Sequence, residues 1–190
     1  MGDAASAIPA LRRAVAAGAE TKALARLAKD PRINRELDAF AKAAAKATDV
    51  KAALRDPRIL NVLLPALGLP DAVGQSGLAL RALTADPKEA GGLLSRLSDT
   101  RWKAAAETLN LRERGVEALR DPKVQASLAD GLRRLAWREE LDADQAGVGD
   151  ALLFRERAST AKTAYDVLGD PVLRRVVTGA LGSGRGWEIG

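Results

Sequence analysis

Carboxylates, lysines, arginines, hydroxyls and one tyrosine are the side chains that this sequence could use for chemistry, because it contains neither histidine nor cysteine. Without histidine the chain lacks the usual general base near neutral pH and the commonest transition-metal ligand. Without cysteine, disulfides and thiolate metal sites are excluded. The acidic pairs Glu139-Glu140 and Glu156/Asp166 have no spacing that brings two carboxylates together in a cleft. We therefore predict no enzyme activity, no catalytic residue, no cofactor and no small-molecule substrate.

One acidic segment resembles the start of a calcium-binding EF-hand loop. Asp142 and Asp144 stand at its first and third positions, and Gly147 stands at its sixth. The fifth position, however, is Ala146, and Leu153 stands where the loop requires a bidentate glutamate. We predict no metal site here and interpret the segment as a capped loop before the next helix.

The glycine-rich end of the chain carries the second pattern with a chemical interpretation. Gly182, Gly184 and Gly186 resemble a phosphate-binding loop only in their spacing, because no strand precedes them and no Gly-Lys-Ser/Thr follows. We predict a flexible tail over residues 183–190. Within it Trp187 has two open interpretations, an anchor for a partner or part of a frayed terminus.

A tryptophan beside two arginines is the clearest candidate for recognition of a partner. An apolar stripe runs along the helix expected to begin at Pro122, and Trp137 falls on the other side of that helix, next to Arg133 and Arg134. Either a second helix covers Trp137, or it is an exposed anchor flanked by arginines, as at many interfaces. Arg133, Arg134, Trp137 and Trp187 are therefore the partner-contact candidates.

The net charge of +5 is confined to the first third of the sequence. Residues 1–60 hold twelve Lys/Arg against seven Asp/Glu, whereas residues 61–190 hold eighteen of each. A basic region of this kind can attract nucleic acid or another anionic partner. The alternative is a solvated face of amphipathic helices, which we favour, so nucleic acid is the less favoured partner.

Helices must position these side chains, and Asp-Pro pairs predict where the helices begin. An aspartate accepts hydrogen bonds from the unpaired amides of the first helical turn, and proline at the first helical position loses no hydrogen bond. The pairs begin at Asp30, Asp56, Asp86, Asp121 and Asp170, and Asp99-Thr100 is a variant. Apolar residues stand three, seven and eleven positions after most of these aspartates, and this spacing of four is typical of a buried helical face.

The composition and these patterns predict an all-α fold, an irregular multi-helix bundle of about ten short helices without a sheet. Expected helices include 87–97, 122–140 and 150–168. Segments 54–68 and 168–182 match over their length, so we expect two similar Asp-Pro-initiated core helices, central and close to each other.

We expect one helical domain over residues 1–182. It divides into basic N-terminal helices (1–48) and two units (49–112 and 113–182). The longest uncharged stretch, residues 59–70, is too short to cross a bilayer, and the N-terminus lacks the pattern of a signal peptide. We therefore expect no membrane span and a cytoplasmic protein.

Several of these motifs together resemble a bacterial family, the domain-of-unknown-function family twelve-seventeen. The motifs are Leu-Arg-Asp-Pro-Arg-Ile-Leu (54–60), Ala-Leu-Gly-Leu (66–69), Leu-Ser-Asp-Thr-Arg-Trp-Lys (97–103), Leu-Asn-Leu (109–111), Val-Leu-Gly-Asp-Pro-Val-Leu-Arg-Arg-Val-Val (167–177) and Ala-Leu-Gly (180–182). The likeness covers roughly residues 38–182. Residues 1–30 have no counterpart in it, and family members usually continue beyond the second Ala-Leu-Gly.

The resemblance implies a helical protein associated with the flagellum, because members are often encoded within flagellar gene clusters. It implies no catalytic residue. Our leading prediction is a non-enzymatic, flagellum-associated protein that acts through helical surfaces on another protein, such as a flagellar component. The alternative is a nucleic-acid-binding or other anion-binding helical domain that uses the basic first third.

Overall fold

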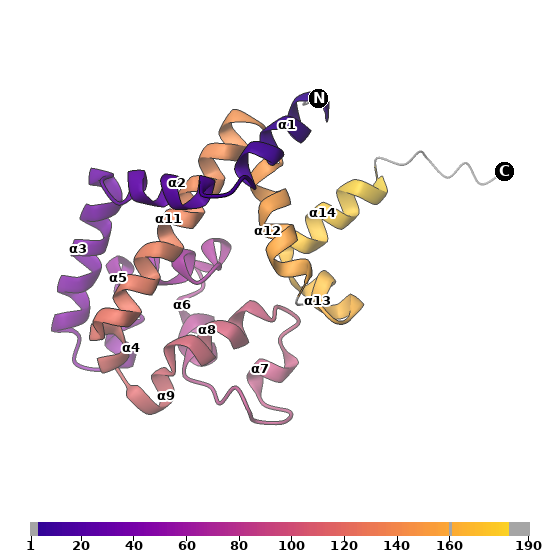
Figure 1. Cartoon of the computed structure of the whole chain (residues 1–190). Coiled ribbons are helices and arrows are strands. Elements are labelled where there is room, and N and C mark those ends of the chain that lie inside the picture. The colour runs from indigo at the N-terminus through magenta and orange to yellow at the C-terminus, as the bar shows by residue number, and fades with distance from the viewer. Residues whose placement is uncertain (1–3, 160, 183–190) are drawn as a thin grey trace.

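The computed structural model describes residues 4–159 and 161–182, and every regular element in these ranges is a helix (Figure 1). The predicted all-α class is confirmed for this part of the chain. In chain order the elements are α1 (Ala4–Ala14), α2 (Ala19–Leu27), α3 (Pro31–Lys46), α4 (Val50–Ala53), α5 (Pro57–Ala66), the 3-10 helix η1 (Pro70–Ala72), α6 (Ser76–Leu83), α7 (Leu93–Arg96), α8 (Arg101–Leu109), α9 (Leu111–Arg114), α10 (Glu117–Arg120), α11 (Pro122–Asp144), α12 (Val148–Ala158), α13 (Ala164–Gly169) and α14 (Pro171–Gly182).

Aspartate side chains begin the helices that follow most of the Asp-Pro pairs. Asp30 accepts hydrogen bonds from the amides of Arg32 and Ile33, at 2.7 and 3.2 Å. Asp56 and Asp121 are the N-cap residues of α5 and α11 in the same way. The first turns of these helices are thus satisfied by a carboxylate, which also suits the positive end of the helix dipole.

The predicted helix start at Asp86 is wrong. Asp86 accepts a hydrogen bond from the amide of Lys88 at 2.9 Å, but only a turn follows, and α7 begins at Leu93. Gly91, at a φ of +75°, interrupts the expected helix 87–97, because two consecutive glycines disfavour helical backbone. Asp99 accepts a hydrogen bond from the amide of Arg101, although Thr100 is the N-cap residue of α8.

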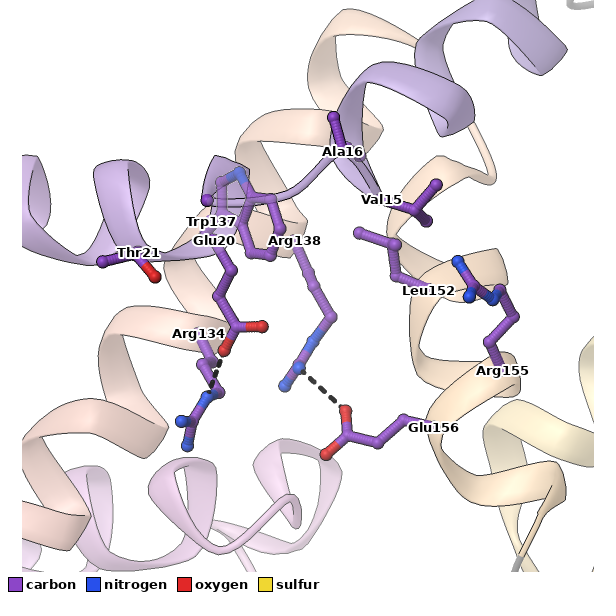
Figure 2. A pocket seen from close by; sticks show the side chains of 12 residues that line it. Val15, Ala16, Glu20, Thr21, Arg134, Trp137, Arg138, Leu152, Arg155 and Glu156 are labelled. Atoms are coloured by element: carbon purple, nitrogen blue, oxygen red, sulfur yellow. Dashed lines mark hydrogen bonds and ion pairs between the residues drawn. The ribbon is translucent and has the colours of Figure 1, made fainter.

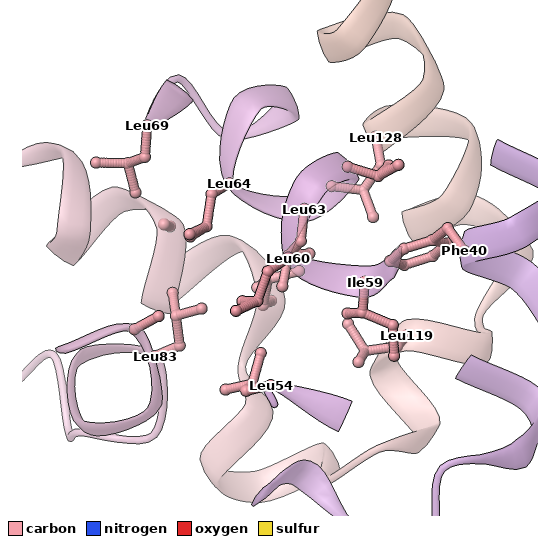
Figure 3. Close-up of a cluster of buried hydrophobic side chains, with 14 of the residues drawn as sticks. Phe40, Leu54, Ile59, Leu60, Leu63, Leu64, Leu69, Leu83, Leu119 and Leu128 are labelled. Carbon is pink, nitrogen blue, oxygen red and sulfur yellow. The ribbon is translucent and has the colours of Figure 1, made fainter. Parts of the chain in front are cut away.

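The larger of two hydrophobic clusters surrounds α5 (Figure 3). The side chains of Ile59, Leu63 and Leu64 on α5 are fully buried. Phe40 on α3 and Leu128 on α11 pack against the same cluster from two sides. Because α5 is surrounded by other helices, its apolar residues extend almost around the helix, as expected for a central core element.

Helix α11 connects this large cluster to a smaller one. It contacts α5 at Gly131, and from Arg134 onward it contacts α2 and α12. The smaller cluster consists of Ala10, Ala14 and Val148, with Leu11, Trp137, Leu141 and Leu152 packed against it. In Figure 1, α11 runs from the region of α4 to the region of α1, so one helix carries residues of both clusters.

The C-terminal helices differ from two expectations. The predicted helix 150–168 is broken, because Thr163 forms a capping box with Asp166 and starts α13 there. Asp170 caps α14, accepting hydrogen bonds from two amides of its first turn, as the sequence pattern suggested. However, α14 packs on α12 and α13 rather than beside α5, so the expectation that both matching helices lie together in the core is wrong.

The crossing of α5 and α11 depends on a glycine. A Cβ atom built on Gly131 of α11 would overlap the carbonyl oxygen of Ala66 at the end of α5. Backbone cannot move aside as a flexible side chain can. Gly131 therefore sets how closely the two central helices approach.

This contact predicts the effect of a single methyl group. Gly131→Ala improves helix propensity by about 1 kcal/mol, but the overlap forces α5 and α11 apart. We expect a net loss of roughly 1–3 kcal/mol in the free energy of unfolding. Urea denaturation followed by circular dichroism measures it.

The matched control is Gly179→Ala on α14, where the new Cβ meets no atom within 4 Å. We expect this variant to keep or gain stability, by up to about 1 kcal/mol. Equal stability changes in the two variants would contradict the proposed role of Gly131.

Candidate functional site

A groove of about 740 Å³ lies between the α1–α2 turn and the helices α11 and α12. The turn contributes Ala14, Val15, Ala16, Gly18, Glu20 and Thr21, α11 contributes Arg134, Trp137 and Arg138, and α12 contributes Leu152, Arg155 and Glu156. Two consecutive helices and a turn from the N-terminal part of the chain thus form its walls (Figure 2). Its volume is within the range of ordinary ligand sites.

Trp137 lies where the groove meets the two hydrophobic clusters. Its ring is partly buried and packs against residues of both clusters. Helices α1 and α12 supply the second of these contacts, through Ala10, Ala14 and Val148. Of the two interpretations of Trp137, the packed one describes most of the ring, while its remaining surface lines the groove.

Two ion pairs cross the groove from α11. The Nε of Arg134 donates a hydrogen bond to Oε1 of Glu20 at 2.6 Å, which joins α11 to α2. This hydrogen bond is the largest cause of the raised pKa of Arg134. On the other side, Nη1 of Arg138 lies 3.8 Å from Oε2 of Glu156 on α12 (Figure 2).

Arg138 is a buried cation whose charge is poorly compensated. Only 15% of its side chain is exposed. Burial lowers the pKa of Arg138, and the more distant charge of Glu156 offsets this only in part. Its one ion pair is too long for a hydrogen bond.

Arg155 and Val15 complete the accessible part of the groove. Arg155 is exposed and makes no hydrogen bond or ion pair within the described ranges. Val15 is 40% exposed, which is unusual among the large apolar side chains of this molecule. The groove thus offers apolar surface next to guanidinium groups.

The structure separates the residues that the sequence singled out for partner binding. Arg134 and Trp137 line the groove, whereas Arg133 does not. Arg133 instead pairs with Asp130 through Nη1 at 3.1 Å, and its Nε is buried without a hydrogen-bond partner. Trp187 and the expected tail 183–190 lie outside the described residues.

Several of the acidic residues considered for chemistry are engaged in structural contacts. Asp142 accepts a hydrogen bond from the amide of Gly149 at 2.8 Å, next to the start of α12. Glu140 pairs with Arg26, and Asp166 belongs to the capping box of α13. Across residues 4–159 and 161–182 no group of three or more acidic side chains is placed to hold a metal ion.

Arg138, Arg155 and Glu20 were not identified from the sequence, and Glu156 was considered there only as an acid without a second carboxylate. Arg138 directly follows Trp137, which is the only signal that could have suggested it. Glu20 lies 114 residues before Arg134, and nothing in the pattern of either segment indicates their contact. The opposite wall of the groove therefore depends on tertiary structure.

A second buried arginine provides a contrast to Arg138. The side chain of Arg101 is 7% exposed, and it donates hydrogen bonds to Asp71, to Asp99 and to the carbonyl oxygen of Gly68. Burial acts to lower the pKa of Arg101, but the hydrogen bonds with Asp99 and Asp71 raise it well above its ordinary value. Arg101, Asp71 and Asp99 thus each have a partner in this cluster, and the cluster stabilises the fold.

Arg157 and Asp170 attach the C-terminal helices next to this cluster. Nη1 of Arg157 donates to Oδ2 of Asp170 at 2.7 Å, and Asp170 is only 4% exposed. A Cβ atom on Gly68 would lie 2.7 Å from Nη2 of Arg157, and a Cβ on Gly169 would overlap the backbone at Ser98. A smaller cavity of about 360 Å³ lies between Arg101 and Arg157, and these charges are committed to internal pairs.

The arrangement in the larger groove is suited to binding. Both of its glutamates face arginines, Glu20 toward Arg134 and Glu156 toward Arg138. Its apolar surface and arginines are the residue types enriched at protein interfaces. Among the described helices, none combines the length and apolar character needed to cross a bilayer.

The architecture defines an all-helical protein with one central core and a lateral groove. The chain belongs to the family described as protein of unknown function DUF1217, whose model matches residues 66–186. The family resemblance predicted from the sequence motifs is therefore confirmed, with a match that begins later than the expected residue 38. Arg134, Trp137, Arg138 and the α12 wall lie inside the match, and the α1–α2 wall lies before it.

A solved structure has the same fold. The crystal structure of protein AGR_C_984 from Agrobacterium tumefaciens is similar with a TM-score of 0.78, at 24% sequence identity. The similarity covers 95% of this chain and 78% of that chain. At this identity the likeness shows the fold alone. A search of curated proteins finds no match.

The Arg101 cluster predicts a pH-dependent contribution to stability. We expect Arg101→Leu to lose roughly 3 kcal/mol near neutral pH, because removal of one partner leaves buried groups uncompensated. The hydrogen bond from Arg101 lowers the pKa of Asp71 below its ordinary 3.8. A lowered pKa stabilises the folded state above the unfolded value, and this contribution disappears as the pH falls through the folded value.

The difference in stability between the wild type and Arg101→Leu should therefore shrink in acid. Urea denaturation near pH 7 and about pH 3 measures it. Arg96→Leu, at an exposed arginine of α7, is the control and should change stability by less than about 0.5 kcal/mol at both values. A constant difference for Arg101→Leu across the range would argue against the Asp71 contact.

Proposed function

We propose that this protein is a non-enzymatic interaction protein of the flagellum that binds another protein through the groove between the α1–α2 turn, α11 and α12. The observation that carries the proposal is the groove itself, where Trp137 and Val15 offer apolar surface beside Arg134, Arg138 and Arg155. Tryptophan and arginine are the residues that most often dominate binding energy at interfaces.

The flagellar part of the proposal is supported by the family. The chain belongs to DUF1217, and the resemblance of its sequence motifs to this family implies a protein encoded with flagellar genes. The basic residues of the first third do not line the groove. The groove therefore supports a protein partner and adds no support to the nucleic-acid alternative.

Site-specific photo-crosslinking in motile cells tests this proposal. A photoreactive benzoylphenylalanine replaces Val15, which is exposed and stands in the groove wall. We expect irradiation to attach a flagellar component, identified by mass spectrometry of the crosslinked band. The same amino acid at Arg96 on α7, which does not line the groove, is the control and should not capture that component.

Two outcomes would contradict the proposal. The first is a folded Val15 variant that crosslinks no flagellar component in motile cells. The second is capture of the same component from both positions, which would place the contact elsewhere or indicate non-specific proximity. Circular dichroism of each purified variant establishes that the helices are intact.

A further inference from the structure

Two arginines of the groove lack a close anionic partner although they stand beside its apolar surface. Arg138 is largely buried, yet its nearest carboxylate oxygen is 3.8 Å away, on Glu156. Arg101, which is buried to a similar extent, is enclosed by two carboxylates and a carbonyl oxygen within 3.2 Å. The comparison shows how the same chain satisfies a buried guanidinium when the contact is purely structural.

The charged side chains that line the groove sum to a net charge of +1. Arg134, Arg138 and Arg155 stand against Glu20 and Glu156, and Glu20 is held by Arg134. Arg155 has no partner within the described residues. An incoming carboxylate could therefore accept hydrogen bonds from guanidinium donors that no internal acid uses, and such charge-assisted bonds are among the strongest in proteins.

We infer that the groove binds an acidic segment of the partner protein, in which Asp or Glu side chains pair with Arg138 and with Arg155 and a neighbouring apolar side chain packs on Trp137, Val15 and Leu152. This inference rests on the proposed function and names the chemistry of its partner. It assigns Arg138 and Arg155 as the residues that determine specificity.

The depth of Arg138 selects a protein side chain over other anions. A duplex or a membrane presents phosphates on a broad surface and is bound by exposed cations. Arg138 is recessed between α11 and α12, so only a group that projects into the groove can reach it (Figure 2). The volume of about 740 Å³ is also larger than one carboxylate needs and has room for an adjacent apolar side chain.

Fluorescence anisotropy with synthetic peptides tests the charge requirement. The probe is a fluorescein-labelled helical peptide that carries glutamates and leucines on one face, and the second peptide has glutamine at every glutamate position. We expect the acidic peptide to bind at least about tenfold more tightly, a difference of about 1.4 kcal/mol. Its affinity should also fall as salt is added, because part of the interaction is exposed to solvent.

Substitutions in the protein locate the contact. Arg155→Gln and Arg138→Gln should each weaken binding of the acidic peptide by about tenfold or more, and neither should weaken binding of the glutamine peptide. Arg96→Gln on α7 removes the same charge outside the groove and should leave affinity unchanged. Arg155 is exposed, so its variant should fold even if Arg138→Gln does not.

Equal affinity for the two peptides, or unchanged affinity in Arg155→Gln, would overturn the inference. Its failure is distinguishable from failure of the proposed function when Arg155→Gln is combined with the Val15 photo-crosslinker. Capture of a flagellar component that Arg155→Gln does not reduce would leave the proposed function standing and reject the acidic-segment inference. Charge-dependent peptide binding without any flagellar crosslink would reject the proposed flagellar function and leave the acidic-segment inference standing.

Discussion

Helix α11 lies against α5 at Gly131, where the backbone of Ala66 leaves no room for a side chain, and the positions of both hydrophobic clusters follow from this crossing. With 23 residues, α11 is about 34 Å long. One half is fixed in the main core by α5, so the other half projects beyond it at a defined angle. The second cluster and the groove are built on that projecting half.

The sequence predicted the parts of the fold that depend on local chemistry. A carboxylate that reaches an amide two or three residues away needs no tertiary contact, so Asp30, Asp56 and Asp121 could be identified as helix starts. The pattern failed at Asp86 because glycines outweigh a favourable cap. The pattern also did not predict where α14 packs, because two helices with similar first turns can pack against different neighbours.

The candidate site was predictable only along one helix. The position of Trp137 opposite the apolar stripe identified an unusual face of α11, and Arg134 lies on the part of that face that lines the groove. Arg133 instead pairs with Asp130, and which of these partners an arginine contacts depends on the packing around the helix. Glu20 comes from a helix far away in the sequence and Glu156 from the helix that follows α11, and the hydrophobic periodicity of a helix does not predict contacts between helices.

The two acids of the groove also tie its walls together, and this makes ligand entry an exchange reaction. Glu20 links α2 to α11 through Arg134, and Glu156 links α12 to α11 through Arg138, so an anion that engages Arg138 competes with Glu156. The net binding free energy is then the gain from the new ion pairs with the ligand minus the loss of the internal ion pair. The affinity therefore stays moderate even when each new contact is strong. Glu156 remains beside Arg138 when such a carboxylate leaves, so the empty groove keeps a counter-ion near its buried cation.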